Sequence, residues 1–317
     1  MKPIFLKYPS IKNYEQIDFS KFPKEILTAG WYSTEKIHGA NMSIIVTPTE
    51  VVGAKRSGFI TDDDKQFKRV IVEQNERFKN IVNGAREYLE QNKQVKQLNI
   101  FGEAFGFGMQ KMDYKQNKDR VKDFLIFDVF RLTKEDYYVP LPLEEMLKYF
   151  GKENLVPIRE IGRIQDLIKT DNPEGESFFG GAREGFVYKM VNPCVYDKNQ
   201  EVPFYNAIKY KGSKFKEVSC KSKTVKTINV NNLPESDQKL FEDVSRYVTT
   251  TRVENVMSHH GFTRYETENI GQIIKETYED VVKEYPLDIT PIEKRLFGKM
   301  LNGLIVSAVK QVFNINN

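Results

Sequence analysis

The stretch from residue 33 to residue 55, STEKIHGANMSIIVTPTEVVGAK, contains an unusual polar group followed by a folding signal. Its second part has two runs rich in β-branched residues, 42–47 and 51–55, around a Pro48-Thr49-Glu50 turn, which predicts a β-hairpin. Its first part sets Lys36 two residues before His38, in a chain that has only three histidines. In an extended segment residues two apart point to the same side, so both side chains are expected to face one site.

The composition indicates a folded globular protein. At 317 residues the chain is long enough for two domains, and 40% apolar and 12% aromatic residues exclude a disordered chain. A net charge of +4 says little about nucleic acid binding. Cys194 and Cys220 are too few for a disulfide framework and lack zinc-ligand spacing. This low cysteine content favours a protein that works in the reducing cytoplasm. No secretory signal and no run of membrane-spanning length stands out, so we expect a soluble cytoplasmic protein.

Outside the hairpin, the first two thirds of the chain mixes helix and strand patterns. Residues 65–91 carry apolar groups at helical spacing among many charges, which predicts a long amphipathic helix. Aromatic and branched residues cluster in further predicted strands, at 98–101, 124–130, 185–190 and 205–210.

The pattern becomes helical after a polar stretch, 221–234, that has no periodicity. One helix is predicted over 235–258, stopped by Gly261, and a second is predicted from a Thr267 cap to about residue 285. A third begins at the capping box formed by Thr290 and Glu293. We therefore predict an α+β domain over 1–225, a linker over 226–234 and a small all-α domain over 235–317.

A lysine acts as a covalent nucleophile only when it is neutral, and nearby cations or a metal ion favour that form. Lys209 and Lys211, in AIKYK, lie on one face of a predicted strand. Two acidic residues next to predicted strands are candidate metal ligands: Glu103, between an apolar strand and a glycine-rich turn, and Glu184, at the start of REGFVYK. Hard divalent cations prefer such oxygen ligands.

The ordered motifs KIHG, AKRSG, FGE, DFLIFDVF, EGFVYK and AIKYK resemble those of the covalent nucleotidyltransferases, which include ATP-dependent ligases and mRNA capping enzymes. The finer resemblance is to the phage-type RNA ligase 2 family, because the lysine motif carries histidine where DNA ligases typically carry aspartate. In addition, RYVTTTRVENVMSHHG is similar to that family's C-terminal segment. The resemblance implies an N-terminal nucleotidyltransferase domain of the ATP-grasp-like ligase type, with antiparallel sheets and flanking helices.

For the nucleotide, the resemblance implies that Lys36 attacks the α-phosphorus of ATP, expels pyrophosphate and holds AMP as a phosphoramidate. Glu184 would bind the catalytic Mg²⁺ or Mn²⁺. Lys209 and Lys211 would contact the α-phosphate and help Lys36 to react. The implied nucleotide-binding set is Glu35 at the adenine edge, Arg56 and Glu103 at the ribose, Phe127 stacked on adenine with Asp128 beside it, Lys189 at phosphate, and Lys36, Lys209 and Lys211.

For the nucleic acid, the resemblance implies that His38 acts after adenylylation, when AMP passes to an RNA 5′-phosphate and a 3′-hydroxyl attacks. The implied RNA-binding residues are His38, Asn41, Lys55, Arg252 and Asp280. We expect a monomeric ATP-dependent RNA ligase that seals 3′-OH/5′-phosphate ends, in particular nicks in duplex RNA. If the chain is phage-encoded, it would work in the cytoplasm of the infected cell.

Two other functions remain open: a GTP-using capping nucleotidyltransferase, and a catalytically silent RNA-end binding protein. Simpler interpretations also stand beside the proposed roles. On pattern alone Phe127 fits the core of a strand, His38 fits a structural role, and His259 and His260 fit a helix end rather than a metal site. Residues 209–226 contain seven lysines and one acid, which suits either RNA or a solvated surface.

Overall fold

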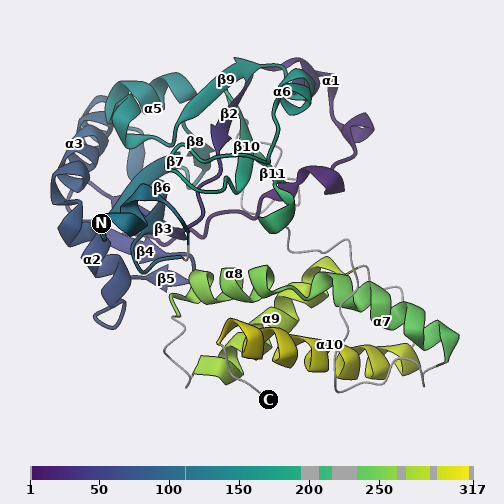
Figure 1. Cartoon of the computed structure of the whole chain (residues 1–317). Coiled ribbons are helices and arrows are strands. Elements are labelled where there is room, and N and C mark those ends of the chain that lie inside the picture. Colours follow the sequence, from purple (N-terminus) through teal and green to yellow (C-terminus); the bar gives the residue numbers. More distant parts are fainter. Residues whose placement is uncertain are drawn as a thin grey trace. The chain divides into compact units, whose positions relative to one another are not determined.

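The computed structural model describes residues 2–110, 112–193, 207–215, 234–262, 269–285 and 291–313. The chain divides into two compact units, Met1–Lys214 and Phe215–Asn317 (Figure 1). The first unit contains two β-sheets with flanking helices, and the described residues of the second are helical. The predicted α+β fold class with a helical C-terminal region is therefore confirmed. The predicted linker 226–234 lies outside the described residues apart from Pro234, so the linker and the boundary at residue 225 stay predictions.

One sheet of the first unit is antiparallel and includes the predicted hairpin. Its strand order is β5-β4-β3-β6-β7-β8. The strand bounds are Gly58–Phe59 for β5, Val51–Lys55 for β4, Ala40–Val46 for β3, Val95–Gly106 for β6, Lys122–Thr133 for β7 and Tyr138–Pro140 for β8. Strands β3 and β4 pair antiparallel, from Met42 opposite Lys55 to Val46 opposite Val51, which confirms the hairpin. Strands β6 and β7 run beyond their predicted ends, so Glu103 lies within β6 rather than between a strand and a turn.

The other sheet has the order β1-β11-β10-β2-β9, with only the β1–β11 pair parallel. The strand bounds are Lys12–Asn13 for β1, Ala207–Lys211 for β11, Gly185–Met190 for β10, Trp31–Glu35 for β2 and Ile158–Gly162 for β9. Strand β10 matches its prediction, and the predicted positions 205 and 206 before β11 lie outside the described residues.

The two faces of this second sheet differ in character. One face packs Trp31, Phe186 and Tyr188 against the short helices α1 (Lys24–Thr28) and α6 (Ile164–Thr170). Because strand residues alternate between faces, Lys189, Lys209 and Lys211 belong to the opposite face. The prediction that Lys209 and Lys211 share one face is therefore confirmed.

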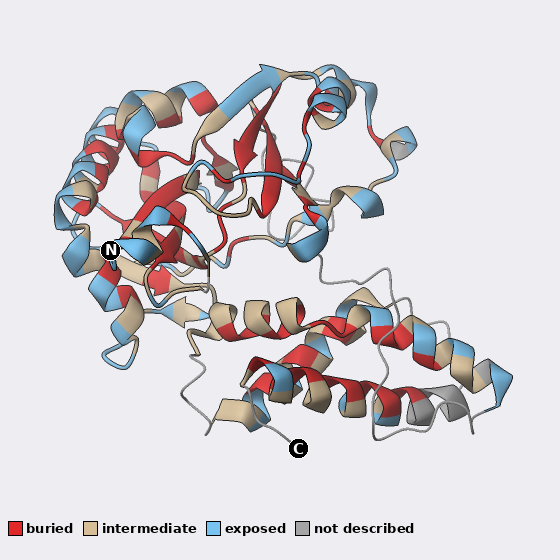
Figure 2. Cartoon of the chain, viewed as in Figure 1, coloured by how far each residue is buried: buried red, intermediate tan, exposed pale blue. Residues whose placement is uncertain are grey.

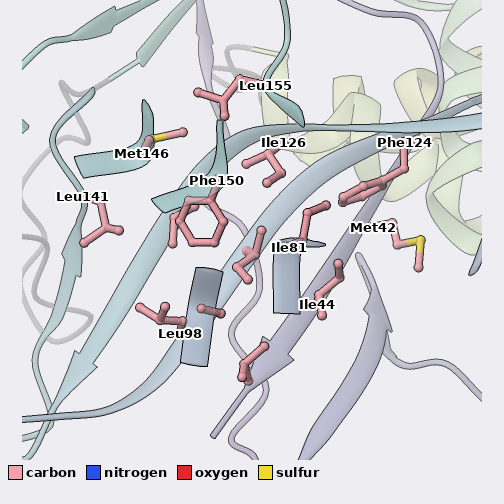
Figure 3. Packing of buried hydrophobic residues seen from close by; sticks show 14 of the residues in the cluster. Met42, Ile44, Ile81, Leu98, Phe124, Ile126, Leu141, Met146, Phe150 and Leu155 are labelled. Atoms are coloured by element: carbon pink, nitrogen blue, oxygen red, sulfur yellow. The ribbon is translucent and has the colours of Figure 1, made fainter. Parts of the chain in front are cut away.

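The main core lies between the six-stranded sheet and the helices α2 (Lys65–Glu73), α3 (Asn75–Gln91) and α5 (Leu143–Phe150). Figure 2 shows that the buried residues of these helices face the sheet, and Figure 3 shows the packing of the buried side chains. The labelled contributors are Met42, Ile44, Ile81, Leu98, Phe124, Ile126, Leu141, Met146, Phe150 and Leu155. Burying this much apolar surface is the main force that holds the first unit together.

The single helix predicted over 65–91 is wrong, because the chain breaks it at Gln74. The break is held by two hydrogen bonds to Lys122 at the start of β7. The Gln74 side chain donates to the Lys122 carbonyl at 2.6 Å, and the Glu73 carboxylate accepts the Lys122 amide at 2.7 Å. Tertiary contacts thus override a helical pattern that is continuous in the sequence. The remaining short elements are α4 (Lys115–Lys118), η1 (Tyr14–Gln16), η2 (Phe19–Lys21), η3 (Lys152–Asn154) and η4 (Ser213–Phe215).

The second unit contains α7 (Glu235–Tyr247), α8 (Thr250–His260), α9 (Ile270–Glu284) and α10 (Pro291–Val312) around one apolar core. The single helix predicted over 235–258 is wrong, because a new helix starts where the Thr249 hydroxyl accepts the Arg252 amide at 3.1 Å. Gly261 ends α8, as predicted, and it adopts the left-handed conformation there. His259 and His260 occupy the last turn of that helix.

Several sequence features lie outside the described residues. They are the two cysteines Cys194 and Cys220, the lysine tract from residue 216 to residue 226, and the predicted helix caps Thr267 and Thr290. In the described part of the chain, no helix combines the length and the apolarity needed to cross a bilayer.

Candidate active site

Lys36, Glu184 and Lys211 come together across three neighbouring strands. The Lys36 amide, just after β2, donates to the Gly185 carbonyl at 2.9 Å, and Gly185 pairs with Lys211 across β10 and β11. One carboxylate oxygen of Glu184 lies 2.9 Å from Lys36 Nζ and 3.3 Å from Lys211 Nζ. The other lies 3.0 Å from Nδ1 of His38. A single carboxylate therefore gathers both lysines and the histidine, and Lys36 and His38 face one site as expected.

The charge of Glu184 is set by these partners. Its side chain is only 2% exposed. Burial alone would raise the pKa of Glu184, but the combined attraction of Lys36, Lys211 and His38 outweighs burial and holds this pKa well below its ordinary value. The two lysines differ in access, since 23% of the Lys36 side chain is exposed and only 5% of the Lys211 side chain. Lys36 is thus the lysine that a ligand can reach more easily.

The backbone around Lys36 is held from several directions, although residues 36–39 form no helix or strand. Each partner comes from a different part of the first unit. The Lys36 amide donates to the Gly185 carbonyl, and the His38 amide donates to the Tyr114 hydroxyl at 3.0 Å. The Gly39 amide donates to the Glu103 carboxylate. The Gly39 carbonyl accepts from the Gln110 side chain at 3.4 Å. Such positioning is what a nucleophile requires.

Two glycines permit the close approach of these segments. A Cβ atom on Gly39 would lie 2.4 Å from the Ala104 carbonyl oxygen, and one on Gly185 would lie 2.0 Å from the Tyr210 carbonyl oxygen. Gly185 also has φ +148°, which side chains rarely adopt. Glycine at both positions therefore allows residue 39 to lie against β6 and the start of β10 to lie against β11.

Glu103 is a second carboxyl group beside Lys36. It lies opposite Asn41 in the β3–β6 pair. Burial raises the pKa of Glu103 to about 7, and the Glu184 carboxylate adds to the rise while Lys36, the Gly39 amide and Arg56 oppose it. Glu103 thus lies close to Lys36, while Asn41 and Arg56 are neighbours of Glu103. Arg56 also donates to the Ser10 hydroxyl at 3.4 Å.

Asp128, Lys189 and Phe127 form a buried group between the two sheets. Lys189 Nζ lies 2.8 Å from the Asp128 carboxylate and also donates to the Phe127 carbonyl. The same nitrogen lies 5.0 Å from the centre of the Phe127 ring. Burial lowers the pKa of Lys189, while Asp128 opposes that shift. Tyr8 completes the group by donating to Asp128 at 2.9 Å.

Glu35 has a different environment from its neighbour Lys36. Its carboxylate accepts from the Ser177 hydroxyl and from the Phe178 amide, the latter at 2.8 Å, and lies 3.9 Å from Arg183 Nε. Burial raises the pKa of Glu35, and these partners oppose the rise. The Glu35 side chain therefore holds the loop around residues 177–178, so adenine recognition by this residue would have to use its backbone.

Lys209 and Lys55, the other expected basic residues of this unit, lie on strands. Lys209 is half-buried on β11, opposite Val187 of β10. Lys55 ends β4, and its Nζ lies 2.6 Å from the Asp64 carboxylate. An RNA phosphate near Lys55 would compete with this ion pair.

Arg252 and Asp280, both expected to serve RNA, lie in the second unit and bind each other. Arg252 has a fully buried side chain, and its guanidinium contacts the Asp280 carboxylate at 2.5 Å and the Glu284 carboxylate at 2.7 Å. The bonds tie α8 to α9. This geometry gives Arg252 a structural position, and any effect on RNA would pass through the shape of the helical unit.

The oxygen donors around Lys36 suit a divalent cation that takes most of its ligands from water or substrate. Glu184 and Glu103 supply oxygen donors, which Mg²⁺ and Mn²⁺ prefer. Within the described residues no group of three or more His, Cys, Asp or Glu side chains could form a complete metal cage. Mg²⁺ is commonly bound by one or two carboxylates together with water and phosphate oxygens, and Glu184 suits this arrangement.

Sequence reasoning missed the residues that support the site. Tyr8, Tyr114 and Ser177 bind Asp128, His38 and Glu35, respectively, across the fold. Their partners are 76 to 142 positions away in the sequence. No local pattern marks such residues, so a single sequence carries no signal for them.

Two regions of the chain match known families. Residues 30–211 match the family described as RNA ligase, and residues 231–303 match the one described as T4 RNA ligase 2 C-terminal. The first match covers more than half of the chain, which therefore belongs to the RNA ligase family. With the second match, the chain is of the T4 RNA ligase 2 type within that family.

Similar solved structures include RNA ligase from Naegleria gruberi. Two of them, a Lys-to-Met variant with AMP and Mn and a Glu-to-Ala variant with ATP and Mn, are 15% identical to this chain with a TM-score of 0.45. A third, with PPi, is 16% identical with a TM-score of 0.45. Each match covers 68% of this chain and 58% of the other chain. The chain thus spans less than two thirds of those proteins.

Proposed function

We propose that this chain is an ATP-dependent RNA ligase that seals a 3′-hydroxyl to a 5′-phosphate, in particular at nicks in duplex RNA. The observation that carries the proposal is the Lys36–Glu184–Lys211–His38 cluster in a chain of the RNA ligase family. It combines an accessible lysine, a buried carboxylate and a second, buried cation. These are the groups that a covalent nucleotidyl transfer requires.

In the first step, the neutral amine of Lys36 attacks the α-phosphorus of ATP. A nitrogen–phosphorus bond forms, the bond to the bridging oxygen breaks, pyrophosphate leaves, and Lys36 gives up a proton. Lys211, which lies 3.3 Å from the Glu184 carboxylate, would neutralise charge on the α-phosphate. Lys209 lies on the same face of the sheet as Lys211. A bound Mg²⁺ or Mn²⁺, held through Glu184, would add charge neutralisation at the phosphate oxygens.

In the next two steps, the AMP group moves to RNA and is then displaced. The 5′-phosphate oxygen attacks the phosphorus of lysyl-AMP, which frees the Lys36 amine and forms a pyrophosphate link between RNA and AMP. The 3′-hydroxyl then attacks the RNA phosphorus and AMP leaves. His38 lies at Glu184 through Nδ1, and its imidazole would contact a phosphate or ribose oxygen in these steps.

Adenosine would occupy the space between the two sheets. Phe127, half-buried and beside Lys189, offers a ring for stacking. Glu103 interacts with both Lys36 and Arg56, and Glu103 and Arg56 suit the ribose hydroxyls. The Asp128–Lys189 pair fixes the strand that carries Phe127. Asn41 and Lys55 lie on the β3–β4 hairpin and are assigned to RNA, as is the helical unit that Arg252 and Asp280 hold together.

The proposal is tested by incubating the full chain with α-labelled ATP or GTP and a divalent metal, and then with nicked RNA, DNA and hybrid duplexes. We expect an adduct with ATP that survives alkali and is lost in acid, followed by sealing of nicked RNA. Lys36→Ala should abolish the adduct and leave the fold intact, and Glu184→Ala should greatly reduce it. An adduct with GTP alone would indicate a capping-type enzyme, and no adduct at all would indicate an RNA-end binding protein.

A further inference from the structure

The side chain of Tyr114 holds the main chain of His38. Its hydroxyl accepts the His38 amide at 3.0 Å. The tyrosine is fully buried, with 0% of its surface exposed. It lies in the segment that follows β6, where sequence patterns predict no function. Neither the nucleophile motif nor the metal site includes it.

The Tyr114 ring is itself fixed in place. It packs edge-on against Phe105 of β6, with ring centres 6.0 Å apart, and against Phe179 at the same distance. The next residue, Lys115, donates its amide to the Phe179 carbonyl at 2.7 Å. A residue held in this way provides a fixed point for the irregular segment 36–39.

The hydroxyl also stays neutral under assay conditions. Burial and the nearby carboxylates of Glu184, Glu35 and Glu103 raise the pKa of Tyr114 well above its ordinary value. A neutral phenol oxygen is a good acceptor for one amide, and its presence among three carboxylates adds no further charge. The contact to His38 is therefore constant with pH.

We infer that Tyr114 is a positioning residue that holds His38 against Glu184 during the steps after adenylylation. Once Lys36 carries AMP, its amine is no longer an ammonium group, so Glu184 loses one of its cationic partners. The backbone anchor at Tyr114 then helps to keep Nδ1 of His38 at the carboxylate, 3.0 Å away. This role rests on the proposed function, and it would make the effect of Tyr114 selective for the later steps.

The test compares Tyr114→Phe with Tyr88→Phe in the full chain. Tyr88 is a matched control, because it is equally buried and its hydroxyl also accepts one hydrogen bond, from Arg131 at 2.8 Å, away from the site. Both substitutions remove one buried oxygen. Unfolding followed by the emission of Trp31 checks that each variant folds.

The first readout needs no activity. With ¹⁵N-labelled histidine the chain gives three backbone signals, and the His38 signal is the one missing from His38→Ala. Loss of an acceptor from a buried amide should speed exchange of the His38 amide with solvent by roughly 5- to 150-fold in Tyr114→Phe, but not in Tyr88→Phe. In the wild type this amide should be strongly protected. Rapid exchange there would overturn the inference even if Tyr114→Phe failed to fold.

The second readout separates the steps. Tyr114→Phe should seal a pre-adenylylated RNA nick more slowly by a factor in the same range, while the rate of Lys36 adenylylation changes less. In a His38→Ala background, Tyr114→Phe should cause no further loss, because it acts through His38. Equal losses in both steps, or losses that multiply in the double variant, would overturn it. If the wild type forms no AMP adduct, the proposed function fails, while the exchange experiment still decides whether Tyr114 anchors His38.

Discussion

Glu103 provides a quantitative test of the electrostatics around Lys36. Burial raises its pKa from the ordinary 4.5 to about 7. When a carboxyl group has a higher pKa in the folded chain than in the unfolded chain, stability falls as pH rises. Its contribution to stability is complete below the pKa of the unfolded chain and is lost as pH rises through the pKa of the folded chain. Ionised Glu103 therefore costs about 3 kcal/mol of stability at about pH 8 and less than about 1 kcal/mol at about pH 5.

Glu103→Gln removes the ionisable group and keeps an oxygen that can accept the Gly39 amide. We expect the free energy of unfolding of the variant, relative to wild type, to rise by about 2 kcal/mol between about pH 5 and about pH 8. The assay is urea unfolding without nucleotide and with a chelator. The single tryptophan, Trp31, is fully buried in the first unit and reports its unfolding.

Glu25→Gln is the control for the change in net charge, since Glu25 is exposed on α1. It should show no such pH-dependent gain. If the Glu103→Gln and wild-type curves stayed parallel over the whole pH range, Glu103 would not have a raised pKa beside Lys36, and the described electrostatics would be wrong.

Four further predictions follow from the geometry. His38→Ala should form the AMP adduct but seal both 5′-phosphate and pre-adenylylated nicks poorly; wild-type rates in all three assays would make it a packing residue. Gly185→Ala should lose about 2 kcal/mol or more beyond Gly58→Ala in urea unfolding, because both have positive φ but only the former meets a carbonyl, at 2.0 Å. Arg252→Met should destabilise the helical unit by about 1–3 kcal/mol in calorimetry, since it removes the charged hydrogen bonds of a buried guanidinium to two partly exposed carboxylates, while adduct yield stays normal. A chain ending at Pro234 should still react with ATP but seal nicked RNA poorly; equal sealing would deny the helical unit a role.

Much of the fold could be predicted from the sequence, because local residue patterns determine many of its strands, turns and helix ends. The hairpin, the strand 185–190 and the helix end at Gly261 follow from alternation, β-branched residues and the conformational freedom of glycine. The breaks at Gln74 and Thr249 could not be read from periodicity. The first is held by hydrogen bonds to Lys122, 48 positions away, and the second by a Thr249 cap placed inside a pattern that continues through it.

The site, like the fold, could be predicted only in part from the sequence. Ordered motifs brought Lys36, His38, Glu184 and Lys211 into one hypothesis, and the structure gathers them at one carboxylate. Roles that depend on side-chain direction were not predictable. Arg252 is buried in ion pairs instead of facing solvent.

Glu35 shows why direction matters. Its carboxylate turns to the loop at residues 177–178, 142 positions away, while the next side chain in the sequence, Lys36, turns to Glu184. Such long-range choices depend on which segments the fold packs together, and one sequence does not show them.

The central claim is that Lys36 carries AMP. Mass spectrometry of peptides from the full chain, after incubation with ATP and Mg²⁺ and quenching in alkali, tests it most directly. We expect a single AMP group on the peptide that contains Lys36, removed on addition of pyrophosphate and absent from Lys36→Ala. An AMP group mapped to Lys209 or Lys211, or an unmodified chain under conditions in which it binds ATP, would contradict the account.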